Sequence, residues 1–274
     1  GSKSDPLATL DGARLFVRNL EKDRPINVIF HEGIYNFDKT VTFTLDDSGK
    51  KDFPITYKTD GEVIFTTADT VDFNDFKLVE KGEDSRIATN LIGKIYKIDL
   101  NKQGIHPGAV PTYYAINIDG DGFEDVNFFV NDKEQLISQW PDGESNYATW
   151  VAVEKAAKEN TIIKVDAYRS KNWQGEKFAY FDGYSGVDYS NEKNNISIDG
   201  DLITLNNTAR FDTDPGFSRR YKVKHLLAEL DKPGEWYLDR DTNIFYYYPT
   251  EDFTEDAKIQ FSSTKLNIDR KSVV

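Results

Sequence analysis

Carboxylate pairs are the side chains of this sequence best suited by type and spacing to do chemistry. The chain has 47 Asp and Glu residues. Two carboxyl groups about 5–10 Å apart can serve as acid and as nucleophile or base in hydrolysis of a glycosidic bond. Most charged side chains are simply solvated, however, so the sequence leaves any catalytic residues unknown. Possible combinations are Glu32 beside His31, Asp231 with Glu235, and Asp239 with Asp241.

A second pattern resembles a calcium-binding loop at residues 117–125. Its candidate oxygen ligands are Asn117, Asp119, Asp121 and Asp125. Calcium takes about six to eight oxygen ligands, and this spacing can supply several of them from one turn. Position 12 of the pattern is Phe128, where a bidentate Glu is expected, so an ordinary acidic turn is the alternative. The sequence predicts at most a structural Ca²⁺ and no other cofactor.

Aromatic side chains are the better candidates for contacts with a sugar. The chain has 4 Trp, 15 Tyr and 18 Phe, and the candidates for sugar binding are Trp140, Trp150, Trp173 and Tyr184. A flat ring suits the C–H face of a sugar, but aromatic side chains also supply much of the buried area of a β-domain. The two interpretations are equally favoured for Trp150 and Trp173, whereas core packing is favoured for Trp236.

Composition excludes several classes of protein. There is no Cys, which rules out disulfides and thiolate chemistry in these residues. The three His residues, His31, His106 and His225, lack metal-ligand spacing, so we expect them at the surface or on strands. A net charge of −13 disfavours binding to a polyphosphate backbone. No apolar run approaches the roughly 18 residues of a membrane span. We therefore expect neither nucleic acid nor membrane insertion.

The elements that must position these side chains are mostly strands. Apolar residues at helical spacing predict one short helix over 10–20, with Thr9 as its N-cap. Alternating apolar residues then predict strands at 26–30, 41–45, 55–57 and 63–65, each bounded by a turn signal. Four strands with no helix between them exclude a βαβ architecture and leave a sandwich, a barrel or a β-solenoid.

The remainder of the chain is also predicted to be β-rich, with acidic loops between residues 67 and 110. Residues 151–158 are expected to form a helical turn or two, and Asn243 is the residue of its turn best able to adopt a left-handed conformation. Strands are predicted at 94–99, 126–140, 161–166, 176–181, 195–205, 219–224, 235–239, 244–248 and 257–261.

Several motifs resemble bacterial right-handed parallel β-helix carbohydrate-active proteins, and those related to glycoside hydrolase family 141 are the most similar. The segments that carry the resemblance are Ala8–Arg14, Val28–Tyr35, Asp47–Gly49, Pro54–Tyr57, Glu229–Arg240 with Phe245–Pro249, and Phe129–Asp132 leading to Trp140-Pro141. Asn243 departs from the family, which usually has Gly there. The resemblance implies an all-β fold: an N-terminal cap helix and first coils of a right-handed parallel β-helix over 1–66, a β-rich inserted domain over 67–262, and a return into the β-helix over 263–274.

The same resemblance implies a secreted, periplasmic or cell-surface protein that forms the N-terminal part of a glycoside hydrolase acting on polysaccharide O-glycosidic bonds. The partner that it implies is a polysaccharide or oligosaccharide. The chain stops within a strand-like pattern, so we expect the catalytic carboxylates of the family to lie beyond it. A non-catalytic carbohydrate-binding or structural β-helix module is the first alternative. A polysaccharide lyase is the second, and the acidic balance disfavours it because uronates would be repelled.

Overall fold

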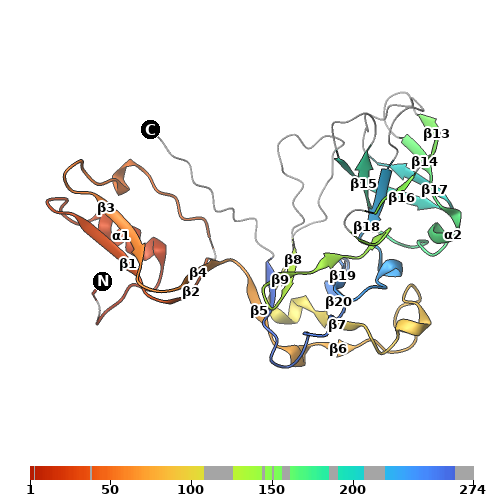
Figure 1. Cartoon of the computed structure of the whole chain (residues 1–274), viewed down its shortest axis with the longest axis horizontal. Helices are drawn as coiled ribbons and strands as arrows, with labels where there is room; N and C mark the ends of the chain where they lie inside the picture. The colour runs from red at the N-terminus through yellow and green to blue at the C-terminus, as the bar shows by residue number, and fades with distance from the viewer. Residues whose placement is uncertain are drawn as a thin grey trace. The chain divides into compact units, whose positions relative to one another are not determined.

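The computed structural model shows a mostly β fold with two short helices among the described residues (Figure 1). These residues are 1–2, 4–37, 39–107, 126–143, 146–149, 151–155, 161–184, 191–206 and 220–262. They belong to two compact units, Gly1–Ala68 (unit 1) and Asp69–Ser263 (unit 2). Neither helix of the described chain is long and apolar enough to cross a membrane.

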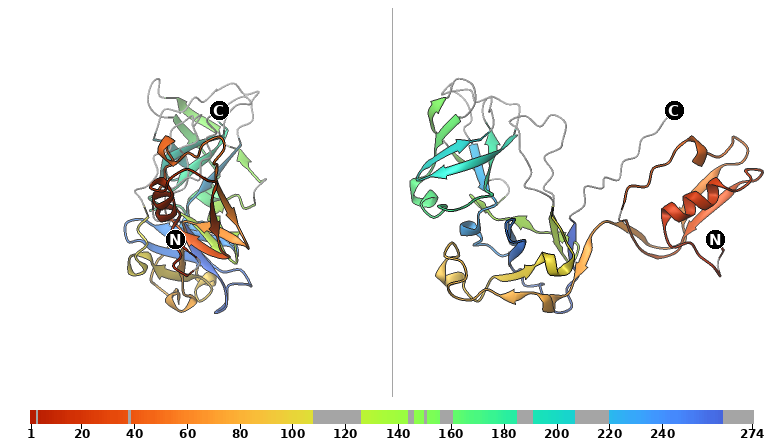
Figure 2. Two further views of the ribbon diagram at one scale, coloured as in Figure 1. Left: turned by 90° about the vertical axis from the view of Figure 1, so that its left-hand side faces the viewer. Right: turned by 180° about the vertical axis from the view of Figure 1, so that it is seen from behind.

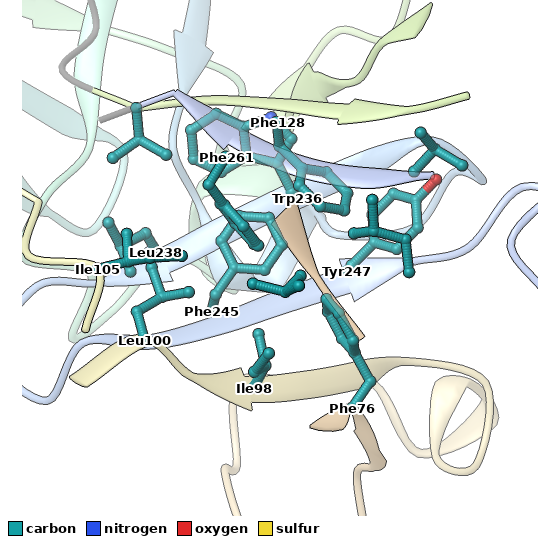
Figure 3. Close-up of a cluster of buried hydrophobic side chains, with 14 of the residues drawn as sticks. Phe76, Ile98, Leu100, Ile105, Phe128, Trp236, Leu238, Phe245, Tyr247 and Phe261 are labelled. Carbon is teal, nitrogen blue, oxygen red and sulfur yellow. The ribbon is translucent and has the colours of Figure 1, made fainter. Parts of the chain in front are cut away.

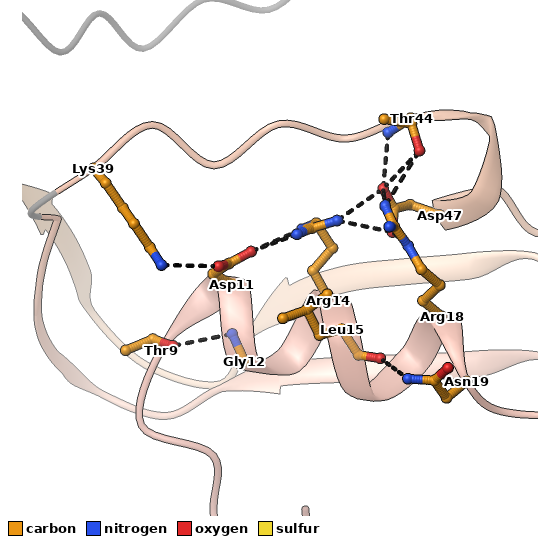
Figure 4. Close-up of polar contacts among 10 residues, drawn as sticks. All are labelled: Thr9, Asp11, Gly12, Arg14, Leu15, Arg18, Asn19, Lys39, Thr44 and Asp47. Carbon is orange, nitrogen blue, oxygen red and sulfur yellow. Dashed lines mark hydrogen bonds and ion pairs between the residues drawn. The ribbon is translucent and has the colours of Figure 1, made fainter.

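Unit 1 begins with helix α1 (Leu10–Arg18), which lies beside the strands of this unit in Figures 1 and 2. The predicted N-cap is confirmed, because the Thr9 hydroxyl accepts the Gly12 N–H at 3.0 Å. Ala13 and Val17 are the buried residues of the helix. Arg18 donates two hydrogen bonds to Asp47 at 2.6 and 2.8 Å, and Arg14 reaches the same carboxylate (Figure 4).

The strands of unit 1 pair in parallel. Strand β1 (Ile26–Phe30) pairs with β3 (Ile55–Thr59), and β2 (Gly33–Asn36) pairs with β4 (Val63–Thr66). The predicted strand at 41–45 is wrong, since residues 45–47 form a 3₁₀ turn. The Asp47 carboxylate accepts the Thr44 backbone N–H at 2.8 Å, so side-chain hydrogen bonding overrides the apolar alternation there.

In unit 2, two sheets enclose an aromatic core. The first has the order β10 (Leu136–Ile137), β19 (Glu235–Asp239), β20 (Ile244–Tyr248), β7 (Tyr96–Asp99) and β6 (Lys77–Leu78). The second has the order β5 (Asp69–Val71), β21 (Ile259–Ser262), β8 (Asn127–Val130) and β9 (Lys133–Glu134). Their side chains meet at Phe128, whose ring centre is 4.8 Å from those of Phe245, Tyr247 and Phe261 (Figure 3).

A third sheet of unit 2 has its own core. Its order is β11 (Gln139–Trp140), β18 (Arg220–Lys224), β15 (Tyr180–Tyr184), β16 (Asn191–Asp199), β17 (Leu202–Leu205), β14 (Thr161–Lys164) and β13 (Val151–Lys155), with β12 (Ala148–Thr149) also on β18. The short helix α2 (Ala167–Ser170) follows β14. The predicted helical turn at 151–158 is wrong for 151–155, because these residues pair antiparallel with β14.

The predicted all-β class is confirmed in its coarse form. The predicted parallel β-helix is not established. Among the described residues, parallel pairing in unit 1 is limited to two strand pairs, and the ladders of unit 2 are antiparallel except for β10 with β19. Asn243 takes the predicted left-handed conformation, with φ 57°. Its short polar side chain tolerates that conformation, which glycine adopts more easily.

His225 was expected at the surface or on a strand, and it is instead buried between the sheets of unit 2 with only 3% of its area exposed. Its Nδ1 lies 3.1 Å from the Phe178 carbonyl, and its Nε2 accepts the Leu238 N–H at 3.2 Å. These partners fix a neutral ring with the proton on Nδ1. Burial, assisted by the charge of Arg240, lowers the pKa of His225 to about 3.

Candidate functional site

Unit 2 carries a pocket of about 670 Å³ beside strand β18. Its lining residues are Trp140, Pro141, Asp142, Asn146, Tyr147 and Arg169. Strands β11 and β12 pair with the same strand, β18: Trp140 lies opposite Val223, and Ala148 lies opposite Tyr221. The chain therefore leaves and rejoins one strand edge. The described residues between β11 and β12, 141–143 and 146–147, are called the pocket loop below, and they supply most of the pocket wall.

The aromatic wall of the pocket is anchored in the core. Trp140 is partly buried, and its ring centre lies 5.7 Å from that of Trp173 and 6.0 Å from that of Tyr221. One side of the indole therefore packs against the third sheet, while the residue also lines the pocket. Tyr147, also partly buried, is the second aromatic side chain of the lining.

The cationic wall is Arg169, held on α2 by a buried network. Asp166 caps this helix by accepting the N–H groups of Tyr168 and Arg169. The Arg169 guanidinium donates to Glu229 and lies 3.2 Å from Asp231. Glu229 is 1% exposed, and its other oxygen accepts the Trp173 indole N–H. Charge-assisted bonds to Glu229 and Asp231 hold the guanidinium in place, so its orientation at the pocket is fixed before any ligand binds.

Next to the pocket, the carboxylates of Asp142, Asp231 and Glu235 offer oxygen atoms that all lie within 4.8 Å of one another. Glu235 is 3% exposed, and burial together with Asp142 and then Asp231 raises its pKa to about 9. Burial and Asp231 also raise the pKa of Asp142. Among the described residues this is the group whose carboxylates could share a hard cation. The raised pKa of Glu235 favours a proton on its carboxyl group in place of a bound cation.

A pH dependence of stability follows from Glu235. Its folded pKa of about 9 lies above the ordinary value of 4.5, so its stabilisation is complete below the ordinary value and is lost as pH rises through about 9. Between pH 7.0 and 8.5 we expect the free energy of unfolding of unit 2 to fall by about 2 kcal/mol through this group. Urea denaturation followed by tryptophan fluorescence measures it, since all four Trp lie in unit 2.

Glu235→Gln is the matched control for that pH dependence. The amide keeps the size of the side chain and does not titrate, so its stability should change less over the same interval. Equal changes for both proteins would show that Glu235 is already ionised at pH 7.

The aromatic residues predicted to bind sugar differ in their exposure and in whether they line the pocket. Trp140 lines the pocket. Trp173, a candidate for which sugar contact and core packing were equally favoured, is fully buried and contacts the ring of Trp140, which favours the core role. Trp236 is likewise a core residue, 1% exposed. Tyr184 ends strand β15, and its side chain is outside the described set, as is Trp150.

The proposed calcium ligands, Asn117, Asp119, Asp121 and Asp125, also lie outside the described residues.

Of the carboxylate combinations, the structure brings Asp231 and Glu235 together. His31 pairs instead with Asp60, at 2.6 Å between Nδ1 and Oδ2, and both side chains are about half exposed. Asp239 accepts the backbone N–H of Asp241 at 3.0 Å, which makes that combination part of a turn.

Sequence reasoning did not select Asp142 or Arg169 for this site. The residues Trp140-Pro141-Asp142-Gly143 are typical of a turn, so the sequence indicates a turn at Asp142. Nothing in the sequence shows that this turn lies beside residue 231.

Comparison with known proteins gives one structural likeness. No protein-family model matches this sequence, and no curated protein matches it. A solved structure described as a glycoside hydrolase is similar to it, with a TM-score of 0.63 and 18% sequence identity. The match covers 95% of this chain and 43% of that chain, so this chain spans less than half the length of the hydrolase. At this identity the likeness shows a shared fold.

Proposed function

We propose that this chain is part of a carbohydrate-active protein and that the unit 2 pocket binds a saccharide. The lining of the pocket is the observation that carries the proposal, since it combines the rings of Trp140 and Tyr147 with the polar groups of Asp142, Asn146 and Arg169. Aromatic faces accept the C–H side of a sugar, and carboxylate, amide and guanidinium groups pair with its hydroxyls. A volume of about 670 Å³ lies within the range of small-molecule sites.

The parent protein we propose is a secreted or cell-surface glycoside hydrolase that cleaves polysaccharide O-glycosidic bonds. The structural likeness to a glycoside hydrolase supports this, and so do the two parallel strand pairs of unit 1, which would be the first coils of a right-handed parallel β-helix. In this proposal the catalytic carboxylate pair belongs to a part of the parent outside these 274 residues. Unit 2 would hold the polysaccharide near that site.

One observation favours a non-catalytic binding module as the second candidate. Glu235 has the raised pKa of a general acid, but it is 3% exposed and is absent from the pocket lining. A general acid must be within hydrogen-bond reach of the leaving group. Glu235 therefore does not fit the role of a general acid toward a ligand in this pocket, which favours binding.

Trp140→Ala tests the binding proposal. Removing the ring deletes the largest aromatic surface of the pocket, and aromatic anchors of this kind often contribute 2 kcal/mol or more. We expect at least about a tenfold loss of affinity for any polysaccharide that the unchanged chain binds. Affinity electrophoresis in gels containing xylan, mannan, galactan or β-glucan measures it.

Tyr168→Ala is the matched aromatic control, because Tyr168 is 74% exposed on α2 and does not line the pocket. Retention of binding by Tyr168→Ala with loss in Trp140→Ala supports the pocket. Binding that survives both changes contradicts it. Hydrolysis of the same polysaccharides by the full-length parent separates the hydrolase from the binding module, since a module alone releases no reducing ends.

A further inference from the structure

Both ends of the pocket loop are paired with the same strand, β18. Lys222 lies on β18 between the two residues with which these ends pair. The chain leaves β18 after Trp140, opposite Val223, and returns at Ala148, opposite Tyr221. A loop that is fastened only at its two ends would have many conformations, so its shape depends on what holds its interior.

Lys222 reaches into this loop with a buried ammonium group. It is 3% exposed, and its Nζ donates to the carbonyl oxygens of Gly143 and, at 3.4 Å, Pro141. The same Nζ lies 5.3 Å from the ring centre of Tyr147. One cation therefore contacts the beginning of the loop and the aromatic ring near its end.

The loop supplies complementary contacts of its own. The Asn146 side-chain amide donates to the Asp142 carbonyl at 2.8 Å, and Gly143 adopts φ 82°, a conformation that favours glycine. The carbonyl oxygens of three consecutive residues, 141 to 143, are thus all bound by side-chain donors. A buried ammonium group needs hydrogen-bond acceptors, and buried carbonyl groups need donors. Lys222 and the carbonyls of residues 141 and 143 satisfy one another.

We propose that Lys222 is the positioning residue of the saccharide pocket: it holds the pocket loop in the conformation that places Asp142 and Tyr147 in the wall. The inference rests on the proposed function, and it adds a residue that does not itself line the pocket. Lys222 lowers the entropy that the loop would lose on ligand binding, so its contribution is to affinity as well as to stability.

Lys222→Met tests the proposal by removing the donor while keeping an unbranched side chain. We expect amide hydrogen exchange at Asp142, Gly143 and residues 146–149 of the folded chain to rise at least tenfold, and retardation in the polysaccharide gels to weaken about tenfold. Lys222→Gln is the milder variant in case methionine prevents folding, because its amide is polar but too short to reach both carbonyls. It should show the same local rise in exchange.

Lys224→Met is the matched control. Lys224 lies two residues along the same strand and pairs with buried Asp182 at 2.7 Å, so its loss also destabilises the third sheet. It should leave exchange in the pocket loop unchanged. Unchanged loop exchange in the Lys222 variants, or an equal rise in Lys224→Met, overturns the positioning role. A chain that binds no polysaccharide, yet shows the local rise in Lys222→Met, overturns the proposed function while keeping the inference about the loop.

Discussion

Trp236→Ala is expected to lower the free energy of unfolding of unit 2 by about 3–5 kcal/mol. Trp236 is 1% exposed, stacks on Phe245 with ring centres 5.4 Å apart, and donates its indole N–H to the Gln135 carbonyl at 3.0 Å. The change removes the ring from the core, leaves a cavity and deprives a buried carbonyl of its donor. Urea denaturation followed by the fluorescence of the other three Trp measures the loss.

Tyr168→Ala serves as the reference for this experiment too. It removes an aromatic ring that is 74% exposed, so the free energy of unfolding should change by less than about 0.5 kcal/mol. A loss of under about 1 kcal/mol in Trp236→Ala would mean that the aromatic core of unit 2 is not packed as the structure shows.

Trp173→Ala is expected to cost a similar amount, about 3–5 kcal/mol, and to disturb the pocket as well. Trp173 is fully buried, contacts the ring of Trp140 and donates its indole N–H to Glu229. Glu229 in turn holds Arg169 of the pocket lining. Loss of Trp173 therefore removes core volume and frees two side chains that shape the pocket. The same denaturation experiment, combined with affinity electrophoresis, measures both effects.

Trp173→Phe separates the two contributions. The phenyl ring keeps most of the apolar contact, but it has no N–H, so one oxygen of buried Glu229 loses its donor. We expect a loss of about 1–3 kcal/mol, smaller than for alanine. A phenylalanine variant as stable as the unchanged chain would show that the indole–carboxylate bond contributes nothing. An alanine variant that keeps full stability but loses saccharide binding would restore Trp173 as a direct ligand contact.

Local patterns predicted the elements well where one short-range interaction dominates. The strands predicted at 219–224, 235–239 and 244–248 lie within a residue of β18, β19 and β20, because each contains aromatic or apolar residues that are buried in a core. Thr9 and Asn243 act as predicted, since capping and left-handed turns depend on neighbouring residues only. The errors at 41–45 and 151–155 have the opposite origin. In the first, the Asp47 carboxylate that accepts the Thr44 N–H is also bound by Arg18, 29 positions away. In the second, strand pairing with β14 overrides the predicted helical turn.

By itself the sequence determined that this chain is rich in β-structure, acidic and rich in aromatic side chains, because these properties depend on composition and short-range periodicity. Only the tertiary structure decided which side chains form the site. The cluster of Asp142, Asp231 and Glu235 joins residues about 90 positions apart, and Lys222 reaches carbonyls about 80 positions away. Such contacts depend on the order of the strands around β18, and that order cannot be predicted from short-range patterns in the sequence.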